Sequence, residues 1–274
     1  MPSRVDLHTH STASDGTMDP QVLLDLAVRL QIRTFALSDH DSTEGWALIA
    51  PRAETIPDFT LIPAVELTAE GEFACHILGY WINPRDPAFQ AQLLAFRERR
   101  VHRLKAMADL LAGLGHAIDY DGILKERQNR SLGRPHLADA LIKKGVVKSR
   151  KEAFDRFLKK GGPAYLPSDT PTAEDVIQLI RRAGGIPVLA HPSYYTTEEL
   201  VKKLAAFGLM GVEAYYPEHS RSLITRYVEL AKGLGLLVTG GSDFHGPKTG
   251  RDSLACVDVP EAVVEALEQA RSHV

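Results

Sequence analysis

Six of the eleven histidines and three carboxylates stand in short motifs that end or follow apolar runs of the chain. These residues are His8 and His10 in VDLHTH, Asp15 shortly after it, His40 in LSDHDS, Glu66 in AVELT, His76 in CHILGY, His191 in LAHP, and Asp243 and His245 in GSDFH. Imidazole nitrogens and carboxylate oxygens together form a ligand set that suits zinc, manganese or iron better than calcium or magnesium. The residue types therefore predict a metal centre, provided that the fold brings the motifs together.

Each motif also has a simpler interpretation when it is taken alone. A single His-x-His pair is a weak indication, and Asp39-His40-Asp41 resembles a hydrogen-bonded turn. His191 could cap a helix or be a buried histidine with satisfied hydrogen bonds, and Glu66 could be a strand-end charge that faces solvent. These interpretations do not hold jointly, because unpaired buried imidazoles and carboxylates are costly. A shared metal cluster satisfies all of them at once.

Short apolar runs alternate with amphipathic helical patterns along most of the chain. We expect strands at 5–10, 34–40, 61–69, 74–81, 186–192, 211–216 and 236–245, with 254–259 as a further candidate. The clearest helices are expected at 19–30 and 172–185, where Asp19 and Thr172 are N-cap residues. This alternation predicts a mainly parallel sheet, open or closed into a barrel. All six histidines are expected at or near C-terminal strand ends, which share one face of a barrel.

One region interrupts the alternation. From about residue 88 to 160 we expect helices in place of strands: one long helix in FQAQLLAFRERRVHRLKAMADLLAGLG and two shorter ones at 136–144 and 150–159. We therefore expect residues 1–95 and 165–274 to form the barrel domain and residues 96–164 to form a helical insertion that contributes to the substrate pocket. The basic run FRERRVHRLK on the long helix is expected to be a solvated face, or else to attract a polyanionic substrate.

Composition limits the classes of protein to consider. The 274 residues are 44% hydrophobic and carry a net charge of −3, which gives no overall attraction to nucleic acid or anionic membrane. Two cysteines make a disulfide framework unexpected. The N-terminus shows no apolar signal region, and no stretch approaches the roughly 18 apolar residues of a membrane span. We expect a cytoplasmic protein that binds no membrane, no stable duplex nucleic acid and no protein partner.

The motifs DLHTHSTASDG, LSDHDS, AVELT, CHILGY, LAHP and GSDFH, in this order, resemble those of the PHP (polymerase and histidinol phosphatase) superfamily. The resemblance extends from residue 5 to about 250 and is strongest to the nucleoside 3′,5′-bisphosphate phosphatase and 5′-3′ exoribonuclease type. It implies an α/β fold, a distorted (β/α)7 barrel with a small helical insertion. Asp15 stands where some other branches have histidine, which favours the branch that acts on nucleotides.

The resemblance also implies two or three divalent metal ions, Mn, Fe or Zn, and assigns their ligands. His8, His10, Glu66 and Asp243 would hold the first ion, Glu66 would bridge to a second completed by His76 and His191, and Asp15, His40 and His245 would hold a third. Attack of a metal-bound hydroxide on phosphorus would follow, as in two-metal hydrolases. Asp243, His40 and His245 would be catalytic, the two histidines as candidate general acids if the third ion is absent. Asp39 is expected to orient a ligand.

The stretch NRSLGRPHLADAL, inside the expected insertion, has the features of a phosphate clamp. Arg134 offers a planar fork to a phosphate, and His136 lies at a helix start, where backbone N–H groups add donors. Relatives of the bisphosphate phosphatase type carry an Arg-x-His pair at this place, usually after a serine. Gly133 replaces that serine here, and Ser131 is the candidate for its hydroxyl. The simpler interpretation is a helix start with a surface arginine.

These features together predict a metal-dependent phosphoesterase. The expected substrate is a small phosphorylated molecule, either a nucleoside 3′,5′-bisphosphate, which would lose its 3′-phosphate, or a short 5′-phosphorylated oligonucleotide. Two alternatives stay open at this point. One is a histidinol-phosphate phosphatase, which would use the same metal-binding face with a different pocket. The other is a non-catalytic, metal-binding structural module.

Overall fold

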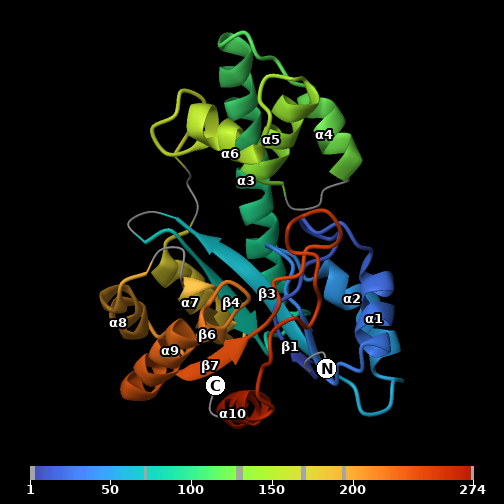
Figure 1. Cartoon of the computed structure of the whole chain (residues 1–274), viewed down its shortest axis with the longest axis vertical. Helices are drawn as coiled ribbons and strands as arrows, with labels where there is room; N and C mark the ends of the chain where they lie inside the picture. Colours follow the sequence, from blue (N-terminus) through green and yellow to red (C-terminus); the bar gives the residue numbers. More distant parts are fainter. Residues whose placement is uncertain (1–3, 71–72, 128–131, 168–170, 193–195, 273–274) are drawn as a thin grey trace. The chain divides into compact units, whose positions relative to one another are not determined.

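The computed structural model describes residues 4–70, 73–127, 132–167, 171–192 and 196–272 (Figure 1). The chain divides into two compact units. The first unit comprises Met1–Ala91 and Pro171–Val274, and the second comprises Gln92–Thr170.

A seven-stranded sheet in strand order β1-β2-β3-β4-β5-β6-β7 forms the centre of the first unit (Figure 1). Its strands are β1 (Val5–Asp6), β2 (Thr34–Leu37), β3 (Thr60–Ala69), β4 (Cys75–Tyr80), β5 (Ile186–Leu189), β6 (Gly211–Tyr215) and β7 (Leu237–Gly240). The neighbours β1 and β2, β2 and β3, β5 and β6, and β6 and β7 pair in parallel. Only β4 runs antiparallel, to both β3 and β5. The prediction of a mainly parallel sheet is confirmed.

The two outer strands of this sheet are linked by the segments that follow them. The backbone N–H of Leu7, just after β1, donates to the carbonyl of Gly240 at the end of β7, with an N···O distance of 3.3 Å. Further along, Thr9 and Phe244 form a parallel β-bridge. The sheet is therefore curled toward closure, and the expected distorted barrel of the α/β class is confirmed.

Helices connect most of the strands of the first unit. They are α1 (Pro20–Arg29), α2 (Glu44–Ala53), α7 (Ala173–Arg182), α8 (Glu198–Ala206), α9 (Arg221–Leu234) and α10 (Ala262–Arg271). The predicted N-caps are confirmed: the side chain of Asp19 accepts from the backbone N–H of Gln21, and Thr172 and Asp175 form a capping box. None of the helices that the structure describes is long and apolar enough to cross a bilayer.

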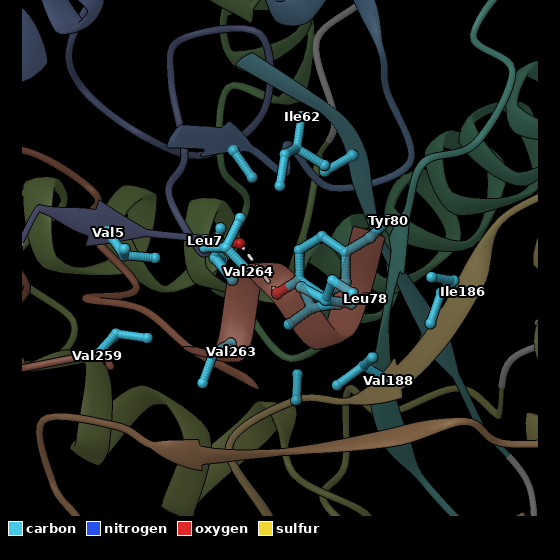
Figure 2. Packing of buried hydrophobic residues seen from close by; sticks show 14 residues of the cluster. Val5, Leu7, Ile62, Leu78, Tyr80, Ile186, Val188, Val259, Val263 and Val264 are labelled. Carbon is cyan, nitrogen blue, oxygen red and sulfur yellow. Dashed lines mark hydrogen bonds between the residues drawn. The ribbon is translucent and has the colours of Figure 1, made fainter. Parts of the chain in front are cut away.

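A cluster of aliphatic side chains fills the space between the sheet and α10 (Figure 2). Val263, Val264 and Leu267 of α10 belong to the same buried cluster as residues of β1 to β5 or their ends, among them Val5, Leu7, Ile62, Leu78, Ile186 and Val188. Tyr80 is fully buried there, and its hydroxyl donates to the carbonyl of Leu7 at 3.0 Å. This core fixes the strands from which the polar residues described below continue.

The second unit is helical, and we find no strand in its described residues. It contains most of α3 (Pro87–Gly113), then α4 (Tyr120–Arg127), α5 (Arg134–Lys143) and α6 (Arg150–Ala153), which continues into a π-helical turn, η1 (Phe154–Leu158). A separate core that includes Leu104, Met107, Leu111, Leu137 and Leu141 holds these helices together. The long helix and the two shorter ones were predicted from the sequence, whereas α4 was not.

The further strand considered at 254–259 is absent, and this expectation was wrong. Ala255 adopts a positive φ of 53°, and its backbone N–H donates to Oδ2 of the buried Asp6 at 2.8 Å. Leu254 and Val259, which suggested alternation, pack into two different hydrophobic clusters. The apolar pattern of this segment therefore reflects a loop in which Leu254, Ala255 and Val259 are buried.

Candidate metal centre

All nine predicted metal-ligand residues lie in the first unit, and their side chains converge. They form four overlapping groups whose candidate ligand atoms lie within 4.8 Å of one another. The groups are His8, His10 and Asp243; His8, Glu66 and His191; His40, Glu66 and His76; and His10, Asp15, His40 and His245. The sequence prediction that these motifs meet in space is confirmed.

The sheet explains why the residues meet. His8 and His10 follow β1, His40 follows β2, His191 follows β5, and Asp243 follows β7, so all lie beyond the C-terminal ends of parallel strands. His76 is different, because it is the second residue of β4 and lies opposite Thr68 of β3. The expectation that His76 stands at a C-terminal strand end was wrong. It reaches the cluster because β4 runs antiparallel, which places its start beside the end of β3.

The carboxylate of Glu66 is divided between two sets of histidines. Its Oε1 atom lies 3.0 Å from Nδ1 of His76 and 3.1 Å from Nε2 of His191. Its Oε2 atom lies 3.1 Å from Nε2 of His10 and 3.3 Å from Nε2 of His8. Glu66 is only 1% exposed, so water does not compete for either oxygen. A carboxylate with each oxygen against separate imidazoles has the geometry needed to bridge two cations.

Asp243 contacts the cluster with one oxygen and the surrounding protein with the other. Its Oδ1 atom lies 3.4 Å from Nε2 of His8 and 3.3 Å from Nε2 of His10. Its Oδ2 atom accepts from the Tyr216 hydroxyl at 3.0 Å and pairs with Nη1 of Arg251 at 2.6 Å. These two contacts fix the carboxylate so that Oδ1 faces the histidines.

The group around Asp15 is looser. Oδ1 of Asp15 lies 3.4 Å from Nε2 of His245, whereas its oxygens are 3.9 Å from the nearest nitrogens of His10 and His40. The Asp15 side chain is 27% exposed, in contrast to the other two carboxylates. Nδ1 of His245 lies 2.8 Å from the carbonyl of Asp243 and must donate to it, so Nε2 is the ring nitrogen that faces Asp15.

A divalent cation fits the donor set that the structure presents. The Nε2 atoms of His8 and His10 are 3.1 Å apart, although at most one of them can donate a proton to the other. Within the part of the chain that the structure describes, His40 Nδ1 lies 3.3 Å from Oε2 of Glu66, and Asp243 Oδ1 lies 3.3 Å from Nε2 of His10, yet both buried atoms lack a well-aligned hydrogen bond. Buried lone pairs that face one another are costly, and a cation bound between them satisfies them.

The protein environment shifts the pKa values of these histidines in opposite directions. Burial opposes protonation of His10, but hydrogen bonds to Asp243 and Glu66 outweigh it and raise the pKa to about 10. Burial likewise disfavours the charged form of His8, yet the carboxylates of Glu213, Asp243 and Glu66 hold its pKa well above the ordinary value. For His40 burial dominates and lowers the pKa to about 3. Protons and a cation would therefore compete at His8 and His10.

The carboxylates of the cluster remain ionised. Burial raises the pKa of Glu66, but electrostatic interactions with the surrounding histidines, His40 and His8 foremost, outweigh it and hold that pKa well below its usual range. The pKa of Asp243 is also held well below its usual range, because His8, His10 and other neighbours outweigh the effect of burial.

Buried polar contacts also hold the segment between His10 and Asp15. Oδ1 of Asp39 accepts from the Ser11 backbone N–H at 2.8 Å and from the Ser14 hydroxyl at 2.6 Å, and its Oδ2 accepts from the Ser11 hydroxyl at 2.8 Å. Asp39 was expected to orient a ligand. It contacts the two serines that flank the turn between His10 and Asp15.

Glu213 is a buried residue near the centre that the sequence analysis missed. It lies in β6, and its Oε1 atom is 2.9 Å from Nδ1 of His8. In the sequence it stands in the apolar run GVEAYY, so an inward glutamate with a histidine partner 205 residues away leaves no local signal.

The predicted phosphate-clamp residues lie in the second unit, except that Ser131 lies outside the described residues. His136 is buried, and its Nδ1 accepts from the backbone N–H of Gly133 at 2.9 Å. It also lines a cavity of about 470 Å³ within this unit. The Arg134 guanidinium lies 5.6 Å from the ring centre of Phe154 and 5.9 Å from that of Tyr165.

A second arginine lies against the same tyrosine. The guanidinium of Arg103, on α3, is 5.4 Å from the Tyr165 ring centre, and its Nε donates to the Leu166 carbonyl at 2.9 Å. Arg103 belongs to the basic run that was expected to be a solvated face, with attraction of a polyanionic substrate as the alternative. It is half-buried, so the expectation of a fully solvated face was wrong for this residue.

No protein-family model matches the chain, but three similar proteins are named as enzymes that cleave phosphate esters. The chain is 34% identical over 268 residues to the 3′,5′-nucleoside bisphosphate phosphatase of Chromobacterium violaceum, covering 94% of this chain and 93% of that protein. It is 33% identical over 252 residues to the 5′-3′ exoribonuclease Rnm of Escherichia coli, covering 88% and 85%. The phosphoribosyl 1,2-cyclic phosphate 1,2-diphosphodiesterase of Eggerthella lenta is 32% identical over 251 residues, covering 90% and 95%.

A solved structure agrees with these relatives. A protein of Bifidobacterium adolescentis described as a metal-dependent phosphoesterase superposes with a TM-score of 0.85 at 29% identity, covering 99% of this chain and 98% of that one. The fold and the His and carboxylate cluster define a metal-dependent phosphoesterase, a hydrolase of phosphoric esters. The chain belongs to the PHP family of these enzymes.

Proposed function

We propose that the chain removes the 3′-phosphate of nucleoside 3′,5′-bisphosphates, with short 5′-phosphorylated oligonucleotides as further substrates of the same centre. The observation that carries the metal-dependent part of this proposal is the division of the Glu66 carboxylate between two sets of histidines. The substrate class follows from the relatives named as a nucleoside bisphosphate phosphatase and an exoribonuclease.

Three ligand sets account for the side chains of the centre. His8, His10 and Asp243 together with Oε2 of Glu66 form the first, and Oε1 of Glu66 with His76 and His191 forms the second. Asp15, His40 and His245 form the third, whose longer separations favour weaker binding. We propose manganese, iron or zinc as the ions, because the sets mix imidazole nitrogen and carboxylate oxygen.

Divalent ions in such a centre lower the pKa of water and neutralise charge that develops on a phosphoryl group. The protein side chains hold the ligand groups in place. Tyr216 and Arg251 fix the Asp243 carboxylate, and Glu66 joins the two tighter sets. Since the pKa of His40 is lowered to about 3, its ring is neutral near pH 7 and suits a ligand better than a proton donor. For His245, the hydrogen bond from Nδ1 to the carbonyl of Asp243 leaves Nε2 as the ring nitrogen that is available to a cation.

Arg134 and Arg103 are the candidates for holding the second phosphate. Both guanidinium groups lie against the ring of Tyr165, which restricts their motion without neutralising their charge. Two restrained guanidinium groups beside one aromatic ring suit an anionic group attached to a nucleoside. His136 supports this cluster by capping the helix that begins at Arg134.

Competing substrates test this assignment directly. The manganese-reconstituted protein would be assayed for phosphate release from adenosine 3′,5′-bisphosphate, a 5′-phosphorylated RNA oligomer, histidinol phosphate and a simple phosphate monoester. A phosphoribosyl 1,2-cyclic phosphate tests the activity named for the Eggerthella lenta relative. We expect the highest kcat/KM for the bisphosphate. Preference for histidinol phosphate or the cyclic diester would refute the substrate class, and no hydrolysis of any ester would favour a structural module.

A further inference from the structure

Glu213 stands where two of the ligand sets meet. It is the third residue of β6, between β5 and β7, and its side chain is fully buried. One oxygen, Oε1, lies 2.9 Å from Nδ1 of His8. The other, Oε2, accepts from the backbone N–H of His191 at 2.7 Å. One carboxylate thus contacts a residue of the first ligand set and a residue of the second.

Both atoms that face Glu213 act as donors when the centre holds metal. A backbone N–H, as in His191, can only donate. Nε2 of His8 points at Nε2 of His10, Oε2 of Glu66 and Oδ1 of Asp243, so a metal ligand must use that nitrogen. The ring proton of His8 then sits on Nδ1 and is donated to Glu213, because the hydrogen bond of one ring nitrogen sets the tautomer of the other.

The contact with His191 has a second effect. His191 adopts φ 29°, a backbone conformation that non-glycine residues rarely occupy and that persists only where neighbouring groups enforce it. The 2.7 Å hydrogen bond from its N–H to Glu213 is such a constraint. The conformation in turn directs Nε2 of His191 to Oε1 of Glu66, at 3.1 Å.

We propose that Glu213 is a positioning residue of the metal centre, which fixes the tautomer of His8 and the backbone of His191 together. This inference rests on the proposed metal sites. Only a carboxylate meets the requirement, because its two oxygens both accept. A glutamine of the same shape has one acceptor and one NH2 group, so in either orientation it sets N–H against N–H at one of the two contacts.

The test compares the full-length protein with its E213Q and D6N variants. Asp6 is a matched control: it is also fully buried close to His8, but its oxygens accept from the backbone N–H groups of His8, Ser242 and Ala255, and not from the ring of His8. Zinc affinity is measured by competition with a chelating dye. Side-chain nitrogen NMR of the zinc-loaded protein reports which nitrogen of His8 carries the proton, with H8N assigning the signal.

We expect wild type to show His8 protonated at Nδ1 and E213Q to bind zinc about 10- to 100-fold more weakly, with that single tautomer lost. D6N is expected to lower the melting temperature while keeping the His8 signal and binding zinc more tightly than E213Q. If E213Q does not fold, E213D replaces it: it keeps two acceptors, so it should retain the Nδ1 proton signal.

Two outcomes overturn the inference, and they differ from failure of the proposed function. If wild type binds zinc and E213Q binds it equally well with an unchanged His8 signal, Glu213 does not position the ligands. If D6N weakens zinc binding and alters the His8 signal as much as E213Q does, loss of any nearby buried carboxylate explains the effect. If wild type itself binds no divalent ion, the proposed metal sites are wrong, and this inference falls with them.

Discussion

The Nε2 atoms of His8 and His10 lie 3.1 Å apart, and both side chains are fully buried. Both residues follow β1, and Thr9 between them forms a parallel bridge with Phe244, so the two rings meet in one cluster. Two imidazole nitrogens at this distance can share one proton or bind one cation, but they cannot both carry protons without repulsion. The pair therefore makes metal binding and proton binding mutually exclusive at this position.

Metal binding to the metal-free protein is expected to release protons even at pH 8. The pKa of His10 is raised to about 10, so its ring stays protonated below that pH and must lose the proton to become a ligand. Apparent affinity should therefore rise with pH until about 10, by about tenfold per unit for each proton displaced. Calorimetric titration with Mn²⁺ in two buffers of different ionisation enthalpy counts these protons.

The H10N variant is the control for that titration, and it should release about one proton fewer per ion bound. Binding by wild type at pH 8 without proton release would show that His8 and His10 are neutral in the metal-free protein, contrary to the charges that surround them.

Glu66→Gln should abolish most of the activity with every substrate. The amide keeps the shape of the side chain but replaces one of the two oxygens that face separate histidine sets. We expect kcat to fall by about 1000-fold or more, at least the cost of removing one preorganised group that stabilises transition-state charge. Metal analysis of the purified variant should show fewer bound ions than wild type. Retention of full metal content together with wild-type kcat would contradict the bridging role.

Gly241→Ala should disrupt the centre through sterics alone. A Cβ atom at this position would lie 2.4 Å from the backbone N and 2.5 Å from the Cβ of His8. The His8 backbone would have to move to relieve these contacts, which costs free energy. We expect a loss of about 1–3 kcal/mol in the free energy of unfolding and weaker metal binding. Gly233→Ala is the matched control, because it lies in α9 with nothing within 4 Å of the added carbon.

Urea denaturation of the two glycine variants provides the comparison. Gly233→Ala should leave metal affinity unchanged and stabilise the protein by up to about 1 kcal/mol. Equal stability of the Gly241 variant and wild type would mean that the close approach to His8 is not a constraint in solution.

Arg134→Ala should raise KM for adenosine 3′,5′-bisphosphate much more than KM for a simple monoester, and Arg103→Ala should act in the same direction. The expected increase is about 10-fold or more, since a charge-assisted hydrogen bond contributes about 1.5–3 kcal/mol. Arg150→Ala is the control within the same unit. Arg150 is about half exposed and pairs with Asp139 at the surface, where an ion pair has little effect. Equal increases for both substrates would contradict the clamp.

The sequence predicted the residues of the centre better than it predicted their arrangement. Period-two spacing of His8 and His10, and the placement of the other motifs at ends of apolar runs, depend only on strand geometry. The direction of β4 does not follow from local pattern, so His76 was assigned to the wrong end of its strand. The segment 254–259 alternates like a strand, but Asp6, far away in sequence, binds its backbone.

Glu213 could not be identified from the sequence pattern either, because the pattern does not show which way its side chain points. A glutamate in an apolar run can point to solvent at a strand edge or inward to a partner, and only the pairing of β6 with β5 and β7 decides between these. Ligand residues appear as clusters of unusual types in the sequence, whereas a residue that supports them stands alone. The contacts of such a supporting residue could therefore be identified only in the structure.

The central claim is that Glu66 joins two metal ions, one on each carboxylate oxygen. Anomalous diffraction from crystals grown with Mn²⁺, recorded above and below the manganese absorption edge, tests it most directly. The account predicts two strong peaks, one bonded to Oε2 of Glu66 with His8, His10 and Asp243, the other bonded to Oε1 with His76 and His191. A single peak, or fully occupied peaks that do not contact Glu66, would contradict it.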